Sequence, residues 1–286
     1  MADPVRSTIP GLQEKKTRGE RLTMLTAYDY PFARLIDGAG VDVVLVGDSL
    51  GMVGLGYTST VPVTMEEMLH HANAVRRGVS RALLVGDMPF MSFQVSPERA
   101  VINAGRFLKE AGCDAVKLEG GSESLEAARA ICKIGIPVMG HLGLTPQTAG
   151  RFGGFKVQGR DAATAEAIVR DAEALQAAGC FSVVLECLPD VLAQRITKRL
   201  RVPTFGIGSG PGCDGQVLVT QDLLGLYDRL QPKFVKRYAE LGHQVQSAIA
   251  QFKRDVEQGQ FPTAAHSYGM TPSNHRRPAK SSRPRV

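Results

Sequence analysis

Short apolar runs alternate along the chain with longer segments of helical periodicity. The runs are rich in β-branched residues and most are apolar at every position, which is typical of strands buried on both faces. This alternation predicts a parallel sheet whose strands are joined by helices. The expected strands are 22–27, 41–47, 82–86, 115–118, 137–140, 182–185 and 203–207, with a weaker eighth near 217–219.

Residues that favour helix ends lie between these runs. Thr64 and Glu67 have the spacing of a capping box at the start of a helix. Glycines that follow an alanine and precede a strand are typical of the left-handed position after a helix. They are Gly40, Gly112 and Gly179. Three similar connections indicate a repeated strand–helix unit.

A polar or ionisable residue follows almost every apolar run. The clearest are Tyr28, Asp29, Asp48, Ser49, Asp87, Lys117, Glu119, His141, Glu186 and Ser209. All strand ends meet at one mouth in a closed barrel, whereas an open doubly wound sheet, the alternative, gathers only the ends near its switch point. We therefore predict a (β/α)8 TIM barrel over residues 22–266, preceded by an N-terminal segment, 1–21.

Composition and cysteine spacing narrow the classes of protein to which the chain can belong. No apolar run approaches the roughly 18 residues that a membrane-spanning helix needs, and the first 21 residues lack the apolar stretch of a secretory signal. The five cysteines contain no CxxC pair, so neither a disulfide framework nor a zinc site is indicated. We expect a cytoplasmic protein with reduced cysteines and no membrane partner.

The net charge of +6 suggests an anionic partner, but it is unevenly distributed. Residues 267–286 hold five basic residues and no acid, so the rest of the chain carries only +1. We expect this basic tail to be disordered, because it has no apolar period. Nucleic-acid binding would need a basic stripe on an ordered element or interleaved aromatics, and neither is evident, so no nucleic-acid partner is expected.

Three carboxylates end three different expected strands. Asp48, Asp87 and Glu119 would repel one another at a common mouth unless they share protons or hold a cation. Oxygen ligands without a thiolate favour Mg²⁺ over zinc or copper. The alternative is that each acid merely caps the helix that follows it.

Three further groups have the chemistry of a site. Lys117 lies two residues before Glu119, so both point to one side of a strand, and a buried lysine there needs an anion: a substrate carboxylate or, as the alternative, a structural partner such as Asp87. Glu186, packed among apolar neighbours, should lose solvation, which makes it the best general-base candidate; the alternative is a salt bridge to a lysine or arginine. His141 is either a hydrogen-bonding group of the site or a structural histidine.

Several strings resemble those of the ketopantoate hydroxymethyltransferase family. They are TAYDYPFA, VLVGDSLGM, PVTMEEM, HLGLTPQ, FGGFKVQGR, LECLP and DGQVLV, spread from about residue 22 to 266. The resemblance implies a barrel of the phosphoenolpyruvate/pyruvate-domain type that assembles as a homo-oligomer, commonly a decamer. It also implies an enzyme of pantothenate biosynthesis, which transfers the one-carbon unit of 5,10-methylenetetrahydrofolate to 3-methyl-2-oxobutanoate and gives 2-dehydropantoate.

The family's site residues carry over to matching positions in this sequence. The resemblance implies Mg²⁺ held by Asp48, Asp87 and Glu119, with Glu186 as catalytic base. It also implies substrate binding by Asp48, Ser49, Asp87, Lys117 and His141. By hypothesis, Glu186 removes a proton beside the carbonyl of the magnesium-chelated 2-oxo acid, and the resulting enolate attacks the folate's methylene carbon. A lyase or aldolase of the same barrel type, acting without folate, is the alternative enzyme.

Overall fold

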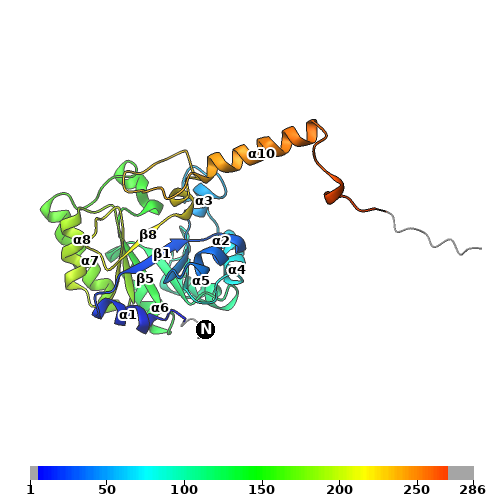
Figure 1. Cartoon of the computed structure of the whole chain (residues 1–286). Coiled ribbons are helices and arrows are strands. Elements are labelled where there is room, and N and C mark those ends of the chain that lie inside the picture. Colours follow the sequence, from blue (N-terminus) through cyan, green and yellow to red (C-terminus); the bar gives the residue numbers. More distant parts are fainter. Residues whose placement is uncertain (1–5, 270–286) are drawn as a thin grey trace, which may run out of the picture. The chain divides into compact units, whose positions relative to one another are not determined.

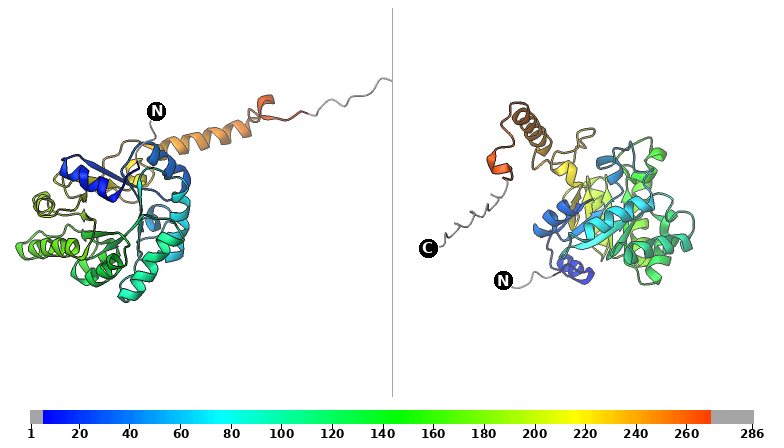
Figure 2. Two further views of the ribbon diagram at one scale, coloured as in Figure 1. Left: turned by 90° about the horizontal axis from the view of Figure 1, so that it is seen from below. Right: turned by 90° about the vertical axis from the view of Figure 1, so that its right-hand side faces the viewer.

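Eight parallel strands close into one barrel in the computed structural model, which describes residues 6–269. The strands follow one another in chain order, and β8 pairs with β1 to complete the ring (Figures 1 and 2). They are β1 (Leu22–Thr26), β2 (Val43–Val46), β3 (Leu83–Asp87), β4 (Ala115–Glu119), β5 (Val138–Gly143), β6 (Ser182–Glu186), β7 (Thr204–Ile207) and β8 (Gly215–Leu218). The predicted barrel is confirmed, and the open sheet is wrong.

Helices join the strands in chain order, and further helices precede β1 and follow β8. They are α1 (Ile9–Thr17), α2 (Tyr30–Gly38), α3 (Leu50–Val53), α4 (Met65–Arg76), α5 (Pro97–Lys109), α6 (Leu125–Lys133), α7 (Ala162–Ala178), α8 (Asp190–Arg199), α9 (Thr220–Leu223) and α10 (Leu241–Glu257), with 3-10 turns η1 (Ser122–Ser124), η2 (Pro146–Phe152) and η3 (Ala264–His266). The capping box of Thr64 and Glu67 begins α4 as predicted. Gly179 follows α7 with a φ of +107°, as expected of a helix-ending glycine.

The two faces of each strand bury different neighbours. Outward side chains such as Val44, Val116 and Val183 pack under the helices, whereas inward ones such as Val85 and Met139 fill the barrel interior. Because side chains alternate along a strand, the next inward positions toward the mouth are fixed. These positions hold Thr26, Asp87, Lys117, Glu119, His141 and Glu186. The interior is therefore apolar in its lower part and charged at its mouth.

Strand β5 runs three residues beyond its predicted end, because Gly143 pairs with Glu186 of β6. Gly143 has a φ of +97°, and a Cβ there would lie 2.1 Å from the Glu186 carbonyl oxygen. Only glycine permits this close approach of the two backbones. The contact fixes the backbone at the strand end that carries Glu186.

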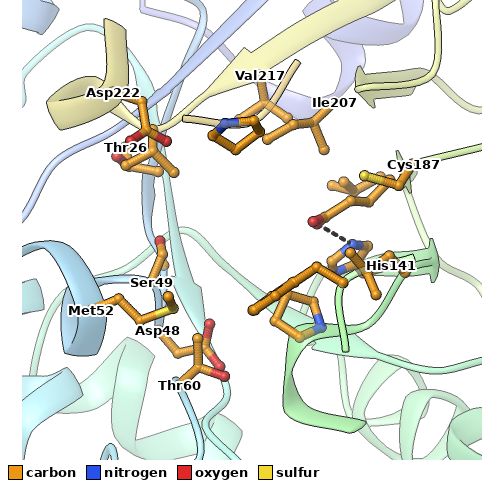
Figure 3. A pocket seen from close by; sticks show the side chains of 18 of the residues that line it. Thr26, Asp48, Ser49, Met52, Thr60, His141, Cys187, Ile207, Val217 and Asp222 are labelled. Atoms are coloured by element: carbon orange, nitrogen blue, oxygen red, sulfur yellow. Dashed lines mark ion pairs between the residues drawn. The ribbon is translucent and has the colours of Figure 1, made fainter. Parts of the chain in front are cut away.

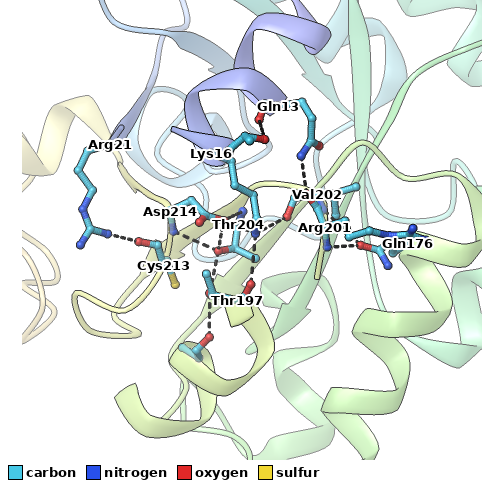
Figure 4. Close-up of polar contacts among 12 residues, drawn as sticks. Gln13, Lys16, Arg21, Gln176, Thr197, Arg201, Val202, Thr204, Cys213 and Asp214 are labelled. Atoms are coloured by element: carbon cyan, nitrogen blue, oxygen red, sulfur yellow. Dashed lines mark hydrogen bonds and ion pairs between the residues drawn. The ribbon is translucent and has the colours of Figure 1, made fainter. Parts of the chain in front are cut away.

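Helix α1 closes the end of the barrel opposite the mouth. Leu12 is buried among the interior side chains of the strands. Lys16 Nζ donates to the carbonyl oxygens of Thr197 and Val202 and pairs with Asp214 Oδ2 at 2.8 Å (Figure 4). The predicted N-terminal segment, 1–21, therefore contains the floor of the barrel.

The chain divides into two compact units, residues 1–239 and 240–286. The second unit contains α10, none of whose residues is buried. The domain boundary predicted at residue 266 lies within this unit, and most of the predicted tail, residues 270–286, lies outside the described residues. Within residues 6–269, no helix is both long and apolar enough to cross a membrane.

Candidate active site

A cavity of about 400 Å³ opens at the C-terminal ends of the strands, where active sites of this fold lie (Figure 3). Every residue that the sequence analysis assigned to the site lines it: Asp48, Ser49, Asp87, Lys117, Glu119, His141 and Glu186. They come from five different strand ends. The barrel thus brings together groups that lie up to 138 residues apart in the chain.

Lys117 lies between two carboxylates. Its Nζ is 2.8 Å from Asp87 Oδ1 and 3.7 Å from Glu119 Oε1, and all three side chains are almost completely buried. Asp87 and Lys117 are direct neighbours in the β3–β4 register. Burial lowers the pKa of Lys117, but the charges of Asp87 and Glu119 outweigh it and raise the pKa above the usual lysine value. The lysine is therefore held as a cation.

Among the three predicted metal ligands, Asp48 has the carboxyl group whose pKa is raised most. Burial, followed by the negative charges of Asp87 and Glu119, raises its pKa well above the ordinary aspartate value. Burial also raises the pKa of Asp87, with Lys117 opposing the shift. The Asp87 Oδ2 atom accepts a hydrogen bond from the Asp48 backbone N–H at 3.1 Å. Neither carboxylate caps a helix, so that alternative is wrong for this pair.

His141 lies between the carboxylates of Glu119 and Glu186. Its Nδ1 is 3.4 Å from Glu119 Oε1, and its Nε2 is 3.1 Å from Glu186 Oε2. Burial and the Lys117 charge lower the pKa of His141, but the two glutamates raise it more, to about 9. His141 therefore connects the Lys117 cluster with Glu186 electrostatically.

Glu186 is the inward residue that ends β6, and its side chain is 14% exposed. Among the described residues no lysine or arginine forms an ion pair with it, so the alternative of a structural salt bridge is wrong, and its ion-pair partner is His141. The next residue, Cys187, has a φ of +49°, which is strained for a side chain that is not glycine. Two backbone hydrogen bonds hold Cys187, from its N–H to Ile207 and from Gln158 to its carbonyl.

Ser49, at the opposite wall of the cavity, is held by a contact with Tyr28. The Tyr28 hydroxyl lies 2.8 Å from Ser49 Oγ, and either atom can donate. Tyr28 is buried, and its desolvation raises its pKa, so the hydroxyl remains protonated. The pair fixes Ser49 beside Asp48 at the rim of the cavity.

Gln147 is a site residue that the sequence analysis did not identify. Its Nε2 donates to Asp48 Oδ2 and to the Met88 carbonyl, both at 2.9 Å, and its backbone N–H donates to Glu119 Oε2 at 3.0 Å. One buried residue thus orients two of the predicted magnesium ligands. It belongs to the HLGLTPQ string, but only the folded structure shows which carboxylates it contacts.

The carboxylates of the cluster suit a divalent cation whose shell is completed by water and substrate, rather than one that protein side chains hold alone. Within residues 6–269, no three His, Cys, Asp or Glu side chains are grouped so that they could hold a metal ion by themselves. Mg²⁺ is commonly bound through only one or two carboxylates, with water and substrate oxygens completing its shell. Burial, followed by the charges of Asp87 and Glu119, raises the pKa of Asp48, and a cation beside these carboxylates would offset their repulsion. The donor chemistry therefore fits Mg²⁺.

Comparison with known proteins identifies the family. The family model for ketopantoate hydroxymethyltransferase matches residues 6–264. A 3-methyl-2-oxobutanoate hydroxymethyltransferase of Moorella thermoacetica is 60% identical over 94% of this chain and all of that protein. One from Syntrophus aciditrophicus is 58% identical over 92% of this chain and 95% of that protein. The chain belongs to the ketopantoate hydroxymethyltransferase family.

Solved structures outside the ketopantoate hydroxymethyltransferase family share its barrel. Phosphonopyruvate hydrolase with oxalate and Mg²⁺ has a TM-score of 0.59 at 12% identity, covering 90% of this chain and 92% of that one. A 2,3-dimethylmalate lyase, described as a member of the PEP mutase/isocitrate lyase superfamily, has a TM-score of 0.56 at 13% identity, covering 92% of each chain. At this identity the likeness shows the fold alone. The lyase alternative thus has only the fold in its favour.

Proposed function

We propose that this protein transfers the one-carbon unit of 5,10-methylenetetrahydrofolate to 3-methyl-2-oxobutanoate, giving 2-dehydropantoate, with Mg²⁺ as its cofactor. Family membership over residues 6–264 supports the reaction class. The observation that carries the proposal is the arrangement at the cavity: Asp48, Asp87 and Glu119 lie buried around Lys117, and Glu186 is linked to them through His141.

The chain's own residues would bind both the carboxylate and the keto oxygen of a 2-oxo acid. Lys117 is a buried cation at the cavity wall that already has Asp87 as its structural partner at 2.8 Å, and it would offer a further N–H donor to the substrate carboxylate. Ser49 and His141 would orient the substrate oxygens by hydrogen bonds. Asp48, Asp87 and Glu119 would hold Mg²⁺ only together with water and substrate oxygens, because these carboxylates are not grouped as a complete metal site, and Gln147 would orient two of them. When bound, Mg²⁺ supplies positive charge at the keto oxygen, which makes the neighbouring C3–H bond more acidic.

Glu186 would act as the base. Its carboxylate would accept the C3 proton, and the electron pair of the broken C–H bond would form the new C–C bond to the one-carbon unit. The one-carbon unit would be freed first: water would add to it, its bonds to N5 and N10 would break, and the two protons of the water would go to these nitrogens as tetrahydrofolate leaves. The oxygen of that water would become the hydroxyl group, and the proton held by Glu186 would return to it once the C–C bond has formed. The His141 Nε2 atom, 3.1 Å from Glu186 Oε2, would hold the carboxylate of the base in position.

Exchange of the C3 proton in deuterated water tests the base without folate. Wild type with Mg²⁺ should exchange this proton of 3-methyl-2-oxobutanoate, and chelation should stop the exchange. Glu186→Gln should reduce it roughly 100- to 10,000-fold, the usual contribution of a general base. Glu173→Gln, at an exposed glutamate paired with Arg199, is the matched control. Undiminished exchange in Glu186→Gln would remove Glu186 from this role.

Product formation tests the whole reaction. The purified protein should form 2-dehydropantoate from the two substrates with Mg²⁺ and should lose this activity with a chelator. Cleavage or synthesis of a 2-oxo acid without folate would support the lyase alternative instead.

We also propose that the chain forms a homo-oligomer, with a decamer as the expected size, in the cytoplasm. Helix α10 supports association because it exposes Val245, Ile249, Phe252 and Val256, which lie on one face at helical spacing. Light scattering after gel filtration measures the size. Ile249→Glu should reduce the assembly, whereas Gln246→Glu, on another face of α10, should not. Cell fractionation tests the location.

A further inference from the structure

The cavity at the mouth is larger than one substrate requires. Its volume of about 400 Å³ is in the range that holds a drug-sized ligand, whereas 3-methyl-2-oxobutanoate is far smaller. The predicted substrate residues occupy one part of it. The remaining part is bounded by the segment that follows β8, which includes Asp222, Tyr227 and Phe234. Both parts belong to one continuous cavity, as direct transfer between two bound substrates demands.

Asp222 is a half-buried acid in this second part, and no established role accounts for it. Within residues 6–269 its carboxylate accepts no hydrogen bond and forms no ion pair. Burial raises the pKa of Asp222 to about 6, although the charge of Arg237 opposes the shift. Figure 3 shows Asp222 near Thr26, across the open space from His141. A desolvated acceptor without a donor is costly, so the position favours a ligand that brings donors.

The backbone around Asp222 is anchored to the barrel. Thr220, two residues earlier, donates from its hydroxyl to the Thr26 carbonyl at 2.5 Å and from its N–H to Thr26 Oγ1 at 3.1 Å. These buried bonds join the start of α9 to the end of β1. The carboxylate of Asp222 is therefore presented from a fixed element rather than from a free loop.

The walls near Asp222 suit an aromatic ring system. Tyr227, Leu230, Pro232 and Phe234 line this part of the cavity, with Phe155 also among the lining residues. Lys233 lines the rim and is exposed to solvent. A ligand for this part would have an edge with two donors, a flat apolar body and an anionic end.

We propose that the part of the cavity around Asp222 binds the one-carbon donor, with Asp222 accepting hydrogen bonds from N3–H and the 2-amino group of its pterin ring. The ring edge presents these two donors side by side, which matches the two oxygens of a carboxylate. The aromatic body would lie against Tyr227 and Phe234, and Lys233 would face the glutamate carboxylates. This inference rests on the proposed function, because it takes 5,10-methylenetetrahydrofolate as the co-substrate.

Steady-state kinetics of Asp222→Asn test the assignment. The variant should raise KM for 5,10-methylenetetrahydrofolate roughly 10- to 100-fold, because an amide replaces one acceptor by a competing donor. KM for 3-methyl-2-oxobutanoate and folate-free C3 exchange should stay within about twofold of wild type. Asp228→Asn, at an exposed acid of the same segment, is the control and should change neither value. An unchanged KM for the folate, or an equal rise in both KM values, would overturn the assignment.

A folate analogue tests the same contact in the unaltered protein. Calorimetry with tetrahydrofolate and its 2-desamino-2-methyl analogue should show that wild type binds the analogue roughly 10- to 100-fold more weakly. Equal affinities would overturn the role of Asp222, even if the variant failed to fold. Failure of the proposed function is a separate result, since wild type would then lack folate-dependent product formation altogether.

Discussion

The two ends of the barrel use buried acids in opposite ways. At the floor, Asp42, Asp114 and Asp214 each precede a strand and accept a hydrogen bond from a backbone N–H of a neighbouring strand, at Thr23, Leu84 and Thr204 respectively. Each also pairs with a basic side chain: Lys15, Arg76 and Lys16. At the mouth, Asp48 and Asp87 are more deeply buried, and they face each other and Glu119 with Lys117 as their shared lysine.

The electrostatic outcome differs accordingly. Asp37, a fourth floor acid, accepts hydrogen bonds from the backbone N–H groups of Ser80, Arg81 and Ala82. Burial raises the pKa of Asp37, but these donors outweigh it and lower the pKa below the ordinary value. The pKa of Asp48 is raised instead. Ionised Asp37 therefore stabilises the fold, whereas ionised Asp48 destabilises it until a cation or substrate arrives.

The largest expected effect comes from removing one charge at the mouth. Asp48→Asn should lower kcat/KM about 100- to 1,000-fold, because it removes an electrostatic contact to the reacting groups. The same change should raise the free energy of unfolding in metal-free buffer, since it relieves repulsion between buried carboxylates. Urea unfolding and initial rates measure the two effects. A variant that is both active and less stable would contradict the contrast between the two ends.

The matching change at the floor should lower the free energy of unfolding and leave the activity nearly unchanged. Asp214→Asn weakens the contact to Lys16, whose side chain is only 13% exposed, and should lower the free energy of unfolding by about 2–4 kcal/mol. The activity of the folded fraction should remain near that of wild type. Thermal unfolding with activity normalised to folded protein checks this. A large loss of kcat without a loss of stability would instead assign Asp214 a role in the reaction, like that of the acids at the mouth.

A positioning residue should give an intermediate effect. Gln147→Leu removes the side-chain donor to Asp48 and should lower activity roughly 10- to 100-fold, as is typical of residues that orient metal ligands. Part of this loss should return at high Mg²⁺ concentration, which a purely structural defect would not allow. A magnesium titration of the rate measures both. Gln158→Leu is the control, because the side-chain amide that it removes donates to the Lys156 carbonyl and the backbone N–H that contacts Cys187 is kept.

The smallest effects are the pH dependences of stability, which should have opposite signs. Asp48 contributes stability below its ordinary pKa of 3.8 and loses it as the pH rises through the raised value. Asp37 contributes stability above 3.8 and loses it as the pH falls through the lowered value. In metal-free buffer, the free energy of unfolding is plotted against pH from about pH 3 to pH 8. This plot should lose its slope above pH 4 in Asp48→Asn and below pH 4 in Asp37→Asn. Identical changes of slope in both variants would refute the contrast.

The sequence by itself determined the strands and much of the site. Short, β-branched apolar runs are typical of strands buried on both faces, and the period of two placed Lys117 and Glu119 on one side of β4 before any contact was known. The ionisable strand ends then indicated a barrel, since only closure gathers them all. The strings around Asp48, His141 and Glu186 indicated the family.

Only the tertiary structure decided which groups meet. The sequence analysis did not single out Asp42, Asp114 and Asp214, because their hydrogen-bond partners lie on the preceding strand, which comes beside them only when the sheet forms. Leu12 reaches the interior, Gln147 contacts Asp48, and Asp222 faces the cavity through contacts between distant segments. Local periodicity fixes the direction of a side chain within its own element. Its neighbour is set by packing across the whole chain, which no local pattern encodes.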